Sequence, residues 1–65
     1  MELGTEAGLL TPEQFGERIG AGRTYVYGEL KANRIKSVKV GRLRRIPVSE
    51  VQRYVDRLLA EQQSA

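Results

Sequence analysis

Two helix-forming segments separated by only three residues constrain the fold of this chain more than any other sequence feature. The first segment opens with Thr11-Pro12-Glu13-Gln14, which combines an N-cap residue, a first-turn proline and the glutamine of a capping box. We expect this helix to run from Pro12 to about Ile19 and to end at Gly20 in the left-handed conformation. Because Gly20-Ala21-Gly22 leaves room only for a tight turn before the next helix, the sequence predicts a helix-turn-helix.

The first helix carries Phe15 and Ile19 one turn apart, and this spacing predicts a buried face. Leu10, just before the helix, is placed to pack on Phe15 as a hydrophobic staple. Gly16 inside the helix costs about 1 kcal/mol relative to alanine. Two interpretations of Gly16 remain open: another helix backbone passes close to it, or it is a neutral surface glycine.

The second helix should cover residues 23–32 and turn Val26 and Leu30, which are four residues apart, toward the core. Its opposite face then offers a hydroxyl, a bare backbone, an ammonium and two phenols, all of which can contact nucleic acid. These groups belong to Thr24, Gly28 and Lys31, flanked by Tyr25 and Tyr27. Alternatives stay open at two positions, because Tyr27 also fits a half-buried core aromatic and Lys31 a solvated cation at the helix C-terminus.

A basic β-hairpin follows the second helix, after a break in which Asn33 is expected to adopt the left-handed conformation and Ile35 to return to the core. Two short β-favouring runs, Val38 to Val40 and Leu43 to Pro47, make up its strands. Because strand side chains alternate, we expect a three-residue loop, Gly41-Arg42-Leu43, that sets Val38 opposite Ile46 on a buried face.

The same register sets Lys39 opposite Arg45 on the solvent face of the hairpin. A two-residue Gly41-Arg42 turn would instead set Val38 against Arg45 and break up the buried face. Like charges that face one another cost stability unless an anion lies between them, and phosphate is the obvious candidate. A hairpin whose basic face is merely solvated is the competing interpretation.

The last helix is expected to begin at Val48 or Ser49 and to end near Glu61. Its apolar residues recur at spacings of 3, 3, 1 and 3 residues, which makes one continuous stripe that closes the core. The stripe consists of Val48, Val51, Tyr54, Val55 and Leu58. At the edge of the stripe, we expect Leu59 to be partly buried in preference to contacting a neighbouring protomer.

Composition restricts the function of this single domain, which should span residues 9–61 between a disordered lead at 1–8 and a frayed tail at 62–65. The chain has no Cys and no His, which excludes thiolate and imidazole metal sites, disulfides and the corresponding nucleophiles. We therefore predict no enzyme, no cofactor and no small-molecule ligand. No apolar run approaches the about 18 residues of a membrane span, and the acidic N-terminus is unlike a signal peptide, so we expect no membrane partner and a cytoplasmic, nucleoid-associated protein.

Positive charge is concentrated in the middle of the chain. Eight basic residues and one acid, Glu29, lie between positions 23 and 45, whereas three basic and seven acidic residues lie elsewhere. The eight are Arg23, Lys31, Arg34, Lys36, Lys39, Arg42, Arg44 and Arg45. Such segregation is typical of a nucleic-acid binder. A membrane-surface patch fits less well, because it would favour a basic amphipathic helix and these charges lie mostly in the hairpin.

Three stretches of the chain resemble a known family, the small excisionase-type winged helix-turn-helix proteins related to the DNA-binding domain of MerR-like regulators. They are Leu10 to Gln14, Gly20 to Tyr27, and the run Val40-Gly41-Arg42-Leu43-Arg44-Arg45-Ile46-Pro47 with the two residues before it. The resemblance covers roughly residues 9–59 and implies a winged helix-turn-helix. It further implies that the second helix enters the major groove of double-stranded DNA and that the wing reaches the neighbouring minor groove or its phosphates.

Carried over position by position, the resemblance assigns two sets of DNA contacts and a supporting pair. The recognition-helix set is Arg23, Thr24, Tyr25, Tyr27 and Lys31, the wing set is Lys39, Arg42, Arg44 and Arg45, and the supporting phosphate contacts are Arg34 and Lys36. Two departures stand out: Gly22 replaces the usual serine cap, and Gly28 replaces a residue that is often long and basic or polar. We therefore expect the wing to supply more of the affinity than the helix.

The function implied is that of an excisionase, or recombination directionality factor. Such a protein would bind repeated sites beside an attachment site, bend the DNA and assist a tyrosine integrase in excising a phage or integrative element. Self-association head to tail on tandem sites would raise occupancy through avidity. The alternative is a MerR-like transcriptional regulator that acts alone on promoter repeats, and a protein-interaction module with an incidental basic face is a third possibility.

Overall fold

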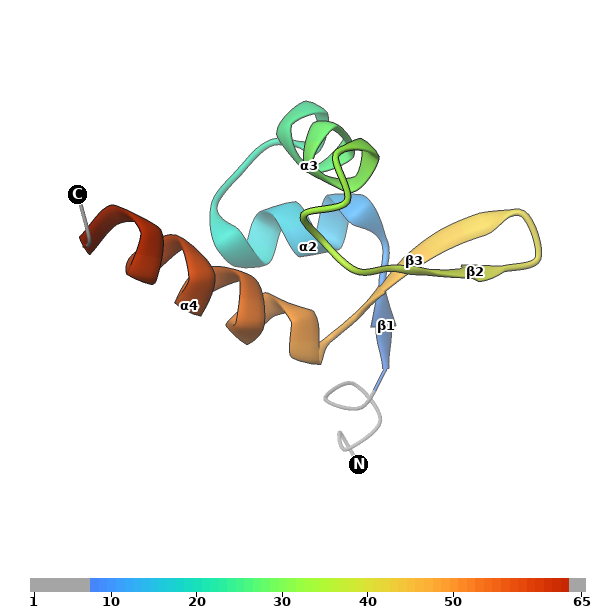
Figure 1. The fold of residues 1–65 in the computed structure, drawn as a ribbon. Helices are drawn as coiled ribbons and strands as arrows, with labels where there is room; N and C mark the ends of the chain where they lie inside the picture. The colour runs from blue at the N-terminus through green and yellow to red at the C-terminus, as the bar shows by residue number, and fades with distance from the viewer. Residues whose placement is uncertain (1–7, 64–65) are drawn as a thin grey trace.

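The computed structural model describes residues 8–63 as three helices and three short strands in one compact arrangement (Figure 1). Their order is β1 (Leu9–Leu10), α2 (Pro12–Ile19), α3 (Arg23–Lys31), β2 (Val38–Val40), β3 (Leu43–Pro47) and α4 (Ser49–Gln63). This is the predicted winged helix-turn-helix, mainly α with a small antiparallel sheet. Of the disordered lead expected at residues 1–8, residues 1–7 lie outside the described residues, as do residues 64–65 of the tail expected at 62–65. Residues 62–63 form the end of α4, which is therefore two residues longer than predicted.

Helix α2 begins and ends as its sequence predicts. The Thr11 backbone N–H donates to Gln14 Oε1 over 2.9 Å, and the Gln14 backbone N–H donates to Thr11 Oγ1 over 3.0 Å, so both bonds of the capping box form. Gly20 ends the helix with φ of 77°, in the left-handed region that glycine enters without steric cost.

The turn between α2 and α3 decides the role of Gly16. A Cβ added at Gly16 would lie 2.6 Å from the carbonyl oxygen of Ala21 and 3.2 Å from Val26 Cγ2. The Ala21 N–H also donates to the Gly16 carbonyl over 2.8 Å. Of the two interpretations, close backbone approach is therefore the right one, because any side chain at this position would push the two helices apart.

The core gathers one or two residues from each helix, one each from β1 and β3, and one from the segment between α3 and β2. Its buried members are Leu10, Phe15, Val26, Leu30, Ile35, Ile46 and Tyr54, with Ile19, Val48, Val51 and Leu58 packed around them. The Phe15 and Tyr54 rings meet edge to face with centroids 5.8 Å apart. The predicted inward faces of α2, α3 and α4 are thus confirmed, but Leu59 is 52% exposed, so its predicted partial burial is wrong.

The sheet has a third strand that the sequence analysis did not anticipate. Strand β3 lies in the middle and pairs antiparallel with β1 on one side and β2 on the other. Leu10 lies opposite Ile46, and the Val48 N–H donates to the Gly8 carbonyl over 3.1 Å. Strand β3 is consequently paired on both of its edges, and β1 holds the hairpin at the root of β3.

The hairpin itself, here called the wing, has a different register from the predicted one. Strands β2 and β3 pair Val38 with Arg45, Lys39 with Arg44 and Val40 with Leu43, around a two-residue Gly41-Arg42 turn. Gly41 has φ of 66°, and a two-residue hairpin turn favours glycine with positive φ at its first central position. Turn chemistry therefore outweighs the burial pattern that predicted a three-residue loop.

The corrected register also overturns the predicted burial of the wing valines. Val38 and Val40 are 44% and 50% exposed, and of the three wing residues predicted to be buried only Ile46 lies in the core. The wing projects beyond the helices, so its outer half has nothing to pack against (Figure 1). The apolar side chains there meet mainly each other across the strands.

Candidate nucleic-acid interface

The outward face of α3 presents the polar groups that the sequence analysis assigned to it. Thr24, Tyr25, Tyr27 and Lys31 are all exposed, and Tyr27, which is 42% exposed, is not among the residues of the core cluster. At Gly28, nothing lies within 4 Å of an added Cβ, so the middle of this face is bare and open. A flat, open helix face of this kind fits into the major groove of DNA.

The first turn of α3 carries a cation whose internal partners are weak. Arg23 lies 3.6 Å from the Glu13 carboxylate, with both side chains well exposed, and its guanidinium lies over the Tyr27 ring at 5.7 Å from the centroid. An exposed ion pair at this distance contributes little to stability. Gly22 precedes it as an N-cap without a side-chain hydrogen bond, so the exposed amides of the first turn and the Arg23 charge both favour an approaching anion.

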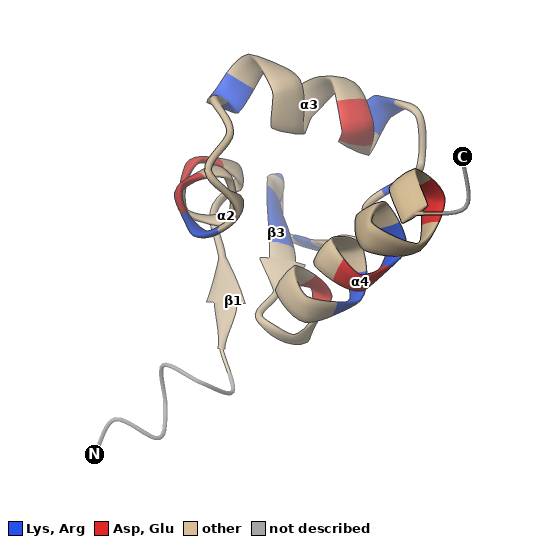
Figure 2. Cartoon of the chain, turned by 90° about the vertical axis from the view of Figure 1, so that its left-hand side faces the viewer, with Lys and Arg blue, Asp and Glu red and all other residues tan. Residues whose placement is uncertain are grey.

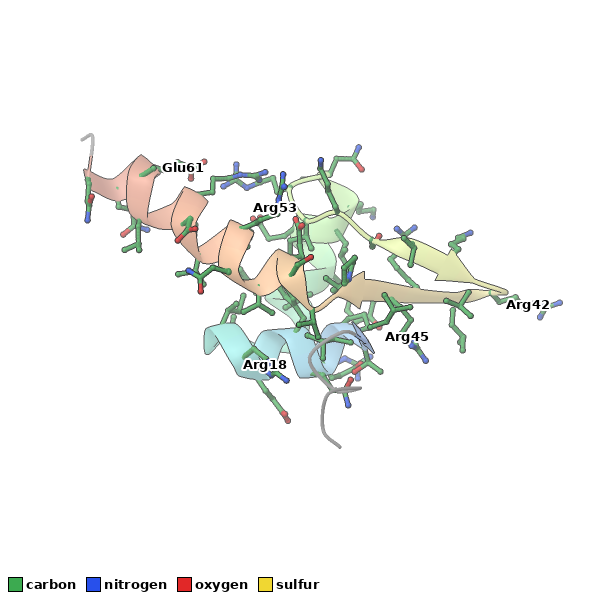
Figure 3. All side chains as sticks on the ribbon, turned by 90° about the horizontal axis from the view of Figure 1, so that it is seen from below. Arg18, Arg42, Arg45, Arg53 and Glu61 are labelled. Carbon is green, nitrogen blue, oxygen red and sulfur yellow. The ribbon has the colours of Figure 1, made fainter. Side chains whose placement is uncertain are left out.

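The wing carries its cations on both faces and at its tip. Lys39 lies directly opposite Arg44 on one face, where Arg44 Nη1 donates to Ser37 Oγ over 2.7 Å. Arg42 lies at the tip and points away from the body, and Arg45 lies closer to the root (Figure 3). The cross-strand pair of like charges predicted for Lys39 and Arg45 is therefore formed by Lys39 and Arg44 instead, because the register is shifted.

Helix α3 and the wing share a surface hollow. The hollow has a volume of about 310 Å³ and is lined by Tyr27, Leu30, Lys31 and Arg44. Arg44 reaches it because it lies on the same strand face as Ile46, which points toward the core. Two cations and a phenol from two elements thus converge over an apolar floor, beside the bare stretch at Gly28.

The two residues expected to support phosphate binding have different surroundings. Arg34 donates from Nε to Glu29 Oε1 over 2.8 Å and from Nη2 to Glu61 Oε1 over 3.0 Å. The hydrogen bonds that Arg34 donates to Glu29 and then to Glu61 raise the pKa of Arg34 above its ordinary value, so its charge is balanced within the protein. The side chain of Lys36 is exposed, and only its backbone N–H is used, in a bond to Glu50.

A hydrogen-bonded chain that the sequence analysis missed connects α3 to α4. Tyr25 Oη lies 2.6 Å from Tyr54 Oη, and Tyr54 Oη donates to Glu29 Oε1 over 2.7 Å. The bond from Tyr54, opposed by burial and aided by Arg34, lowers the pKa of Glu29. Burial, followed by the bond to Glu29, raises the pKa of Tyr54 well above its ordinary value.

Helix α4 holds the wing root through two further bonds. Glu50, which is only 4% exposed, accepts from the Lys36 backbone N–H over 3.0 Å, and Arg57 Nη1 donates to the Arg34 carbonyl over 2.7 Å. With Tyr54 and Glu61, these residues lie at spacings of 4, 3 and 4 on one face of α4. That spacing is the only signal that could have found them, because no apolar pattern marks a polar stripe.

The charged residues are distributed differently over α3 and the wing than over α2 and α4. Figure 2 shows cations at the ends of α3 and along β3, and mixed charges on α2 and α4. Within residues 8–63, no group of three or more His, Cys, Asp or Glu side chains could hold a metal ion. In the same part of the chain, every helix is too short or too polar to cross a membrane.

Comparison with known proteins agrees with this geometry. The sequence profile of a family described as a helix-turn-helix domain matches residues 9–58, from β1 into α4. The chain belongs to this helix-turn-helix family.

One relative of this helix-turn-helix protein is described as a probable excisionase from Saccharopolyspora erythraea. The two are 44% identical over 57 residues, which is 88% of this chain and 58% of the relative. The chain thus spans less than two thirds of the length of the curated relative that it matches. No solved structure matches at a significant level.

Proposed function

We propose that this helix-turn-helix protein binds double-stranded DNA with α3 in the major groove and the wing over the adjacent backbone or minor groove. The observation that carries the proposal is the hollow between α3 and the wing, where Lys31 and Arg44 converge beside the bare face at Gly28. A sugar-phosphate strand that passes between two neighbouring grooves has the charge and the shape to lie there. It would also lie against the Lys39 and Arg44 pair and relieve the repulsion between them.

The assigned contacts divide between specificity and affinity. Thr24 and Tyr27 on α3 are proposed to face base edges, and Arg23 and Lys31 the flanking phosphates. Tyr25 is proposed to take part through its exposed ring, because its hydroxyl is bonded to Tyr54. In the wing, Lys39, Arg42, Arg44 and Arg45 are proposed to bind phosphates or the minor groove. Lys36 is a supporting contact, and Arg34 would serve as one only if DNA competes with Glu29 and Glu61 for its guanidinium.

The role we propose within DNA binding is that of an excisionase. The supporting observation is the 44% identity to a relative described as a probable excisionase. In this role the protein binds repeated sites near an attachment site, self-associates head to tail, bends the DNA and assists a tyrosine integrase. A MerR-like regulator that binds promoter repeats would share the same fold, so the assay has to separate the two.

Salt dependence of binding tests whether the basic surface meets DNA. If about five phosphates are contacted, the logarithm of the association constant should fall with the logarithm of salt concentration with a slope of about −4 to −5. Fluorescence anisotropy with a duplex selected by the protein from a random-sequence library gives this slope. A flat dependence would contradict DNA binding and favour a protein-interaction module.

Excision activity tests the finer role. DNA flanking the gene is footprinted with the protein, and an integrase reaction on attachment-site DNA is run with and without it. Protection of repeated sites together with increased excision is expected. Unchanged excision, with protection confined to promoter repeats, would contradict the excisionase role and establish the regulator.

A further inference from the structure

Tyr54 is a deeply buried residue of α4 whose polar hydroxyl contacts two residues of α3. It is 1% exposed, its ring packs edge to face on Phe15, and its hydroxyl lies between Tyr25 and Glu29 of α3. Tyr25 and Glu29 are four residues apart, so they lie one turn apart on the same side of α3. A single atom of α4 is therefore tied to two successive turns of the helix that would enter the groove.

The direction of the hydrogen bonds in this chain follows from the carboxylate at its end. An ionised Glu29 can only accept, and its Oε1 receives both Arg34 Nε–H and the Tyr54 hydroxyl. The single proton of Tyr54 is used in that bond, so Tyr25 must be the donor in the 2.6 Å contact between the phenols. The Tyr25 proton thus points into the protein and cannot be donated to a phosphate.

The same face of α4 also fixes the wing root. Glu50 and Arg57 bind the backbone at Lys36 and Arg34, which lie in the segment that leads from α3 into β2. The recognition helix and the root of the wing are held by one stripe of α4 and not only by the core. Their relative placement depends on polar contacts whose geometry is more directional than that of apolar packing.

We propose that Tyr54 is a positioning residue for DNA recognition, which fixes the rotation of α3 about its axis through the bonds of its hydroxyl to Tyr25 and Glu29. This inference rests on the proposed binding of DNA by α3. Tyr54 is too buried to touch DNA, so it acts through Tyr25 and Glu29. It sets the direction in which Thr24 and Tyr27 face the base edges, and so contributes to specificity and not to phosphate binding.

The test is a double-mutant cycle with Tyr54→Phe and Tyr25→Phe, because each change removes only a hydroxyl and keeps the ring. Affinities are measured on the duplex that the wild type selects from a random library and on a scrambled duplex of the same length and composition. Tyr54→Phe removes the hydrogen bonds to both Tyr25 and Glu29 and should weaken binding to the selected duplex about three- to tenfold, a loss comparable to the net value of one hydrogen bond. Binding to the scrambled duplex should not change, because every charge is retained.

The cycle separates positioning from direct contact. If Tyr25 acts through Tyr54, the double variant binds the selected duplex no more weakly than Tyr54→Phe alone. Additive losses would mean that the Tyr25 hydroxyl contacts DNA independently and would overturn the proposal. Equal losses on both duplexes, or none on either, would overturn it as well.

Arg42→Ala is the control, since Arg42 lies at the tip of the wing and does not depend on the rotation of α3 (Figure 3). Combined with Tyr54→Phe, it should give additive losses on the selected duplex, and a non-additive result would point to general loosening of the fold and overturn the proposal. Thermal melts confirm that each variant is folded at the assay temperature. If the wild-type protein selects no duplex from the random library, DNA binding itself is refuted. If the wild type and Tyr54→Phe bind the selected duplex equally well, only the positioning role is refuted.

Discussion

The wing and the inner face of α4 both carry charged side chains, but they use them in opposite ways. Within residues 8–63, no wing cation forms an ion pair, and the two with recorded bonds, Arg44 and Arg45, donate to a neutral hydroxyl and a carbonyl. On the α4 side, Arg34 is bound to two carboxylates and Glu50 is buried with a backbone partner. Charges that are balanced internally hold the fold, and charges left in repulsion are available for an external anion.

The largest expected difference lies within the wing, between its buried root in β3 and an exposed position in β2. Ile46→Ala removes a fully buried side chain and should cost about 2–5 kcal/mol of unfolding free energy. Val40→Ala, at a half-exposed position, should cost less than about 0.5–1 kcal/mol. Urea denaturation of the two variants measures both values, and similar losses would show that the wing packs against the body.

The next largest effect tests the contact between α2 and α3. Gly16→Ala adds a methyl group 2.6 Å from the Ala21 carbonyl oxygen, so the turn must open. We expect a net loss of about 1–3 kcal/mol, since the clash exceeds the gain in helix propensity of about 1 kcal/mol. Gly28→Ala is the control in open space and should be neutral or stabilising by thermal melting. A stabilised Gly16→Ala variant would contradict the close approach.

A smaller effect depends on pH and concerns Glu29, one of the charges that are balanced within the protein. The bond from Tyr54 holds the pKa of Glu29 below its ordinary value of 4.5, so ionised Glu29 stabilises the folded state above that value. This contribution is lost as the pH falls through the folded pKa, when the carboxylate gains a proton. The difference in melting temperature between the wild type and Glu29→Gln should therefore shrink on acidification below 4.5. A difference that stays constant over this range would contradict the assignment.

The smallest effect on stability should come from the wing tip. Arg42→Ala should leave the melting temperature unchanged, because the side chain points away from the body and is exposed (Figure 3). On DNA, loss of one phosphate contact should reduce the magnitude of the salt slope by about 1 and weaken binding on all sequences alike. Arg34→Ala gives the contrast, since it should lower stability through Glu29 and Glu61. If Arg42→Ala lowered the melting temperature more than Arg34→Ala, the distinction between exposed wing charges and internally paired charges would be wrong.

Local signals predicted the helices of this fold well. Thr11 and Gln14 mark one helix start, Gly20 and Asn33 adopt positive φ where the helices end, and the spacing of Val26 and Leu30 identifies the buried face of α3. Each of these signals depends on neighbours within one or two helical turns. Predictions based on such local signals are confirmed because no distant contact competes with them.

Features that depend on distant contacts were predicted incorrectly or missed. The wing register was wrong because an alternating apolar pattern indicates a buried face only if another element covers it, and nothing covers Val38 and Val40. Strand β1 has two residues and exists only through its pairs with β3. The partners of Tyr54 lie 25 and 29 residues away, and no periodicity reveals them.

The central strand β3 connects the wing directly to α4. The strand is continuous from Leu43, beside the wing tip, to Pro47, and α4 begins two residues later at Ser49. The wing is thus connected through β3 to α4, and α4 is connected through the Tyr54 hydroxyl to α3. We therefore expect a duplex that engages both the wing and α3 to adapt its groove width and curvature to the protein.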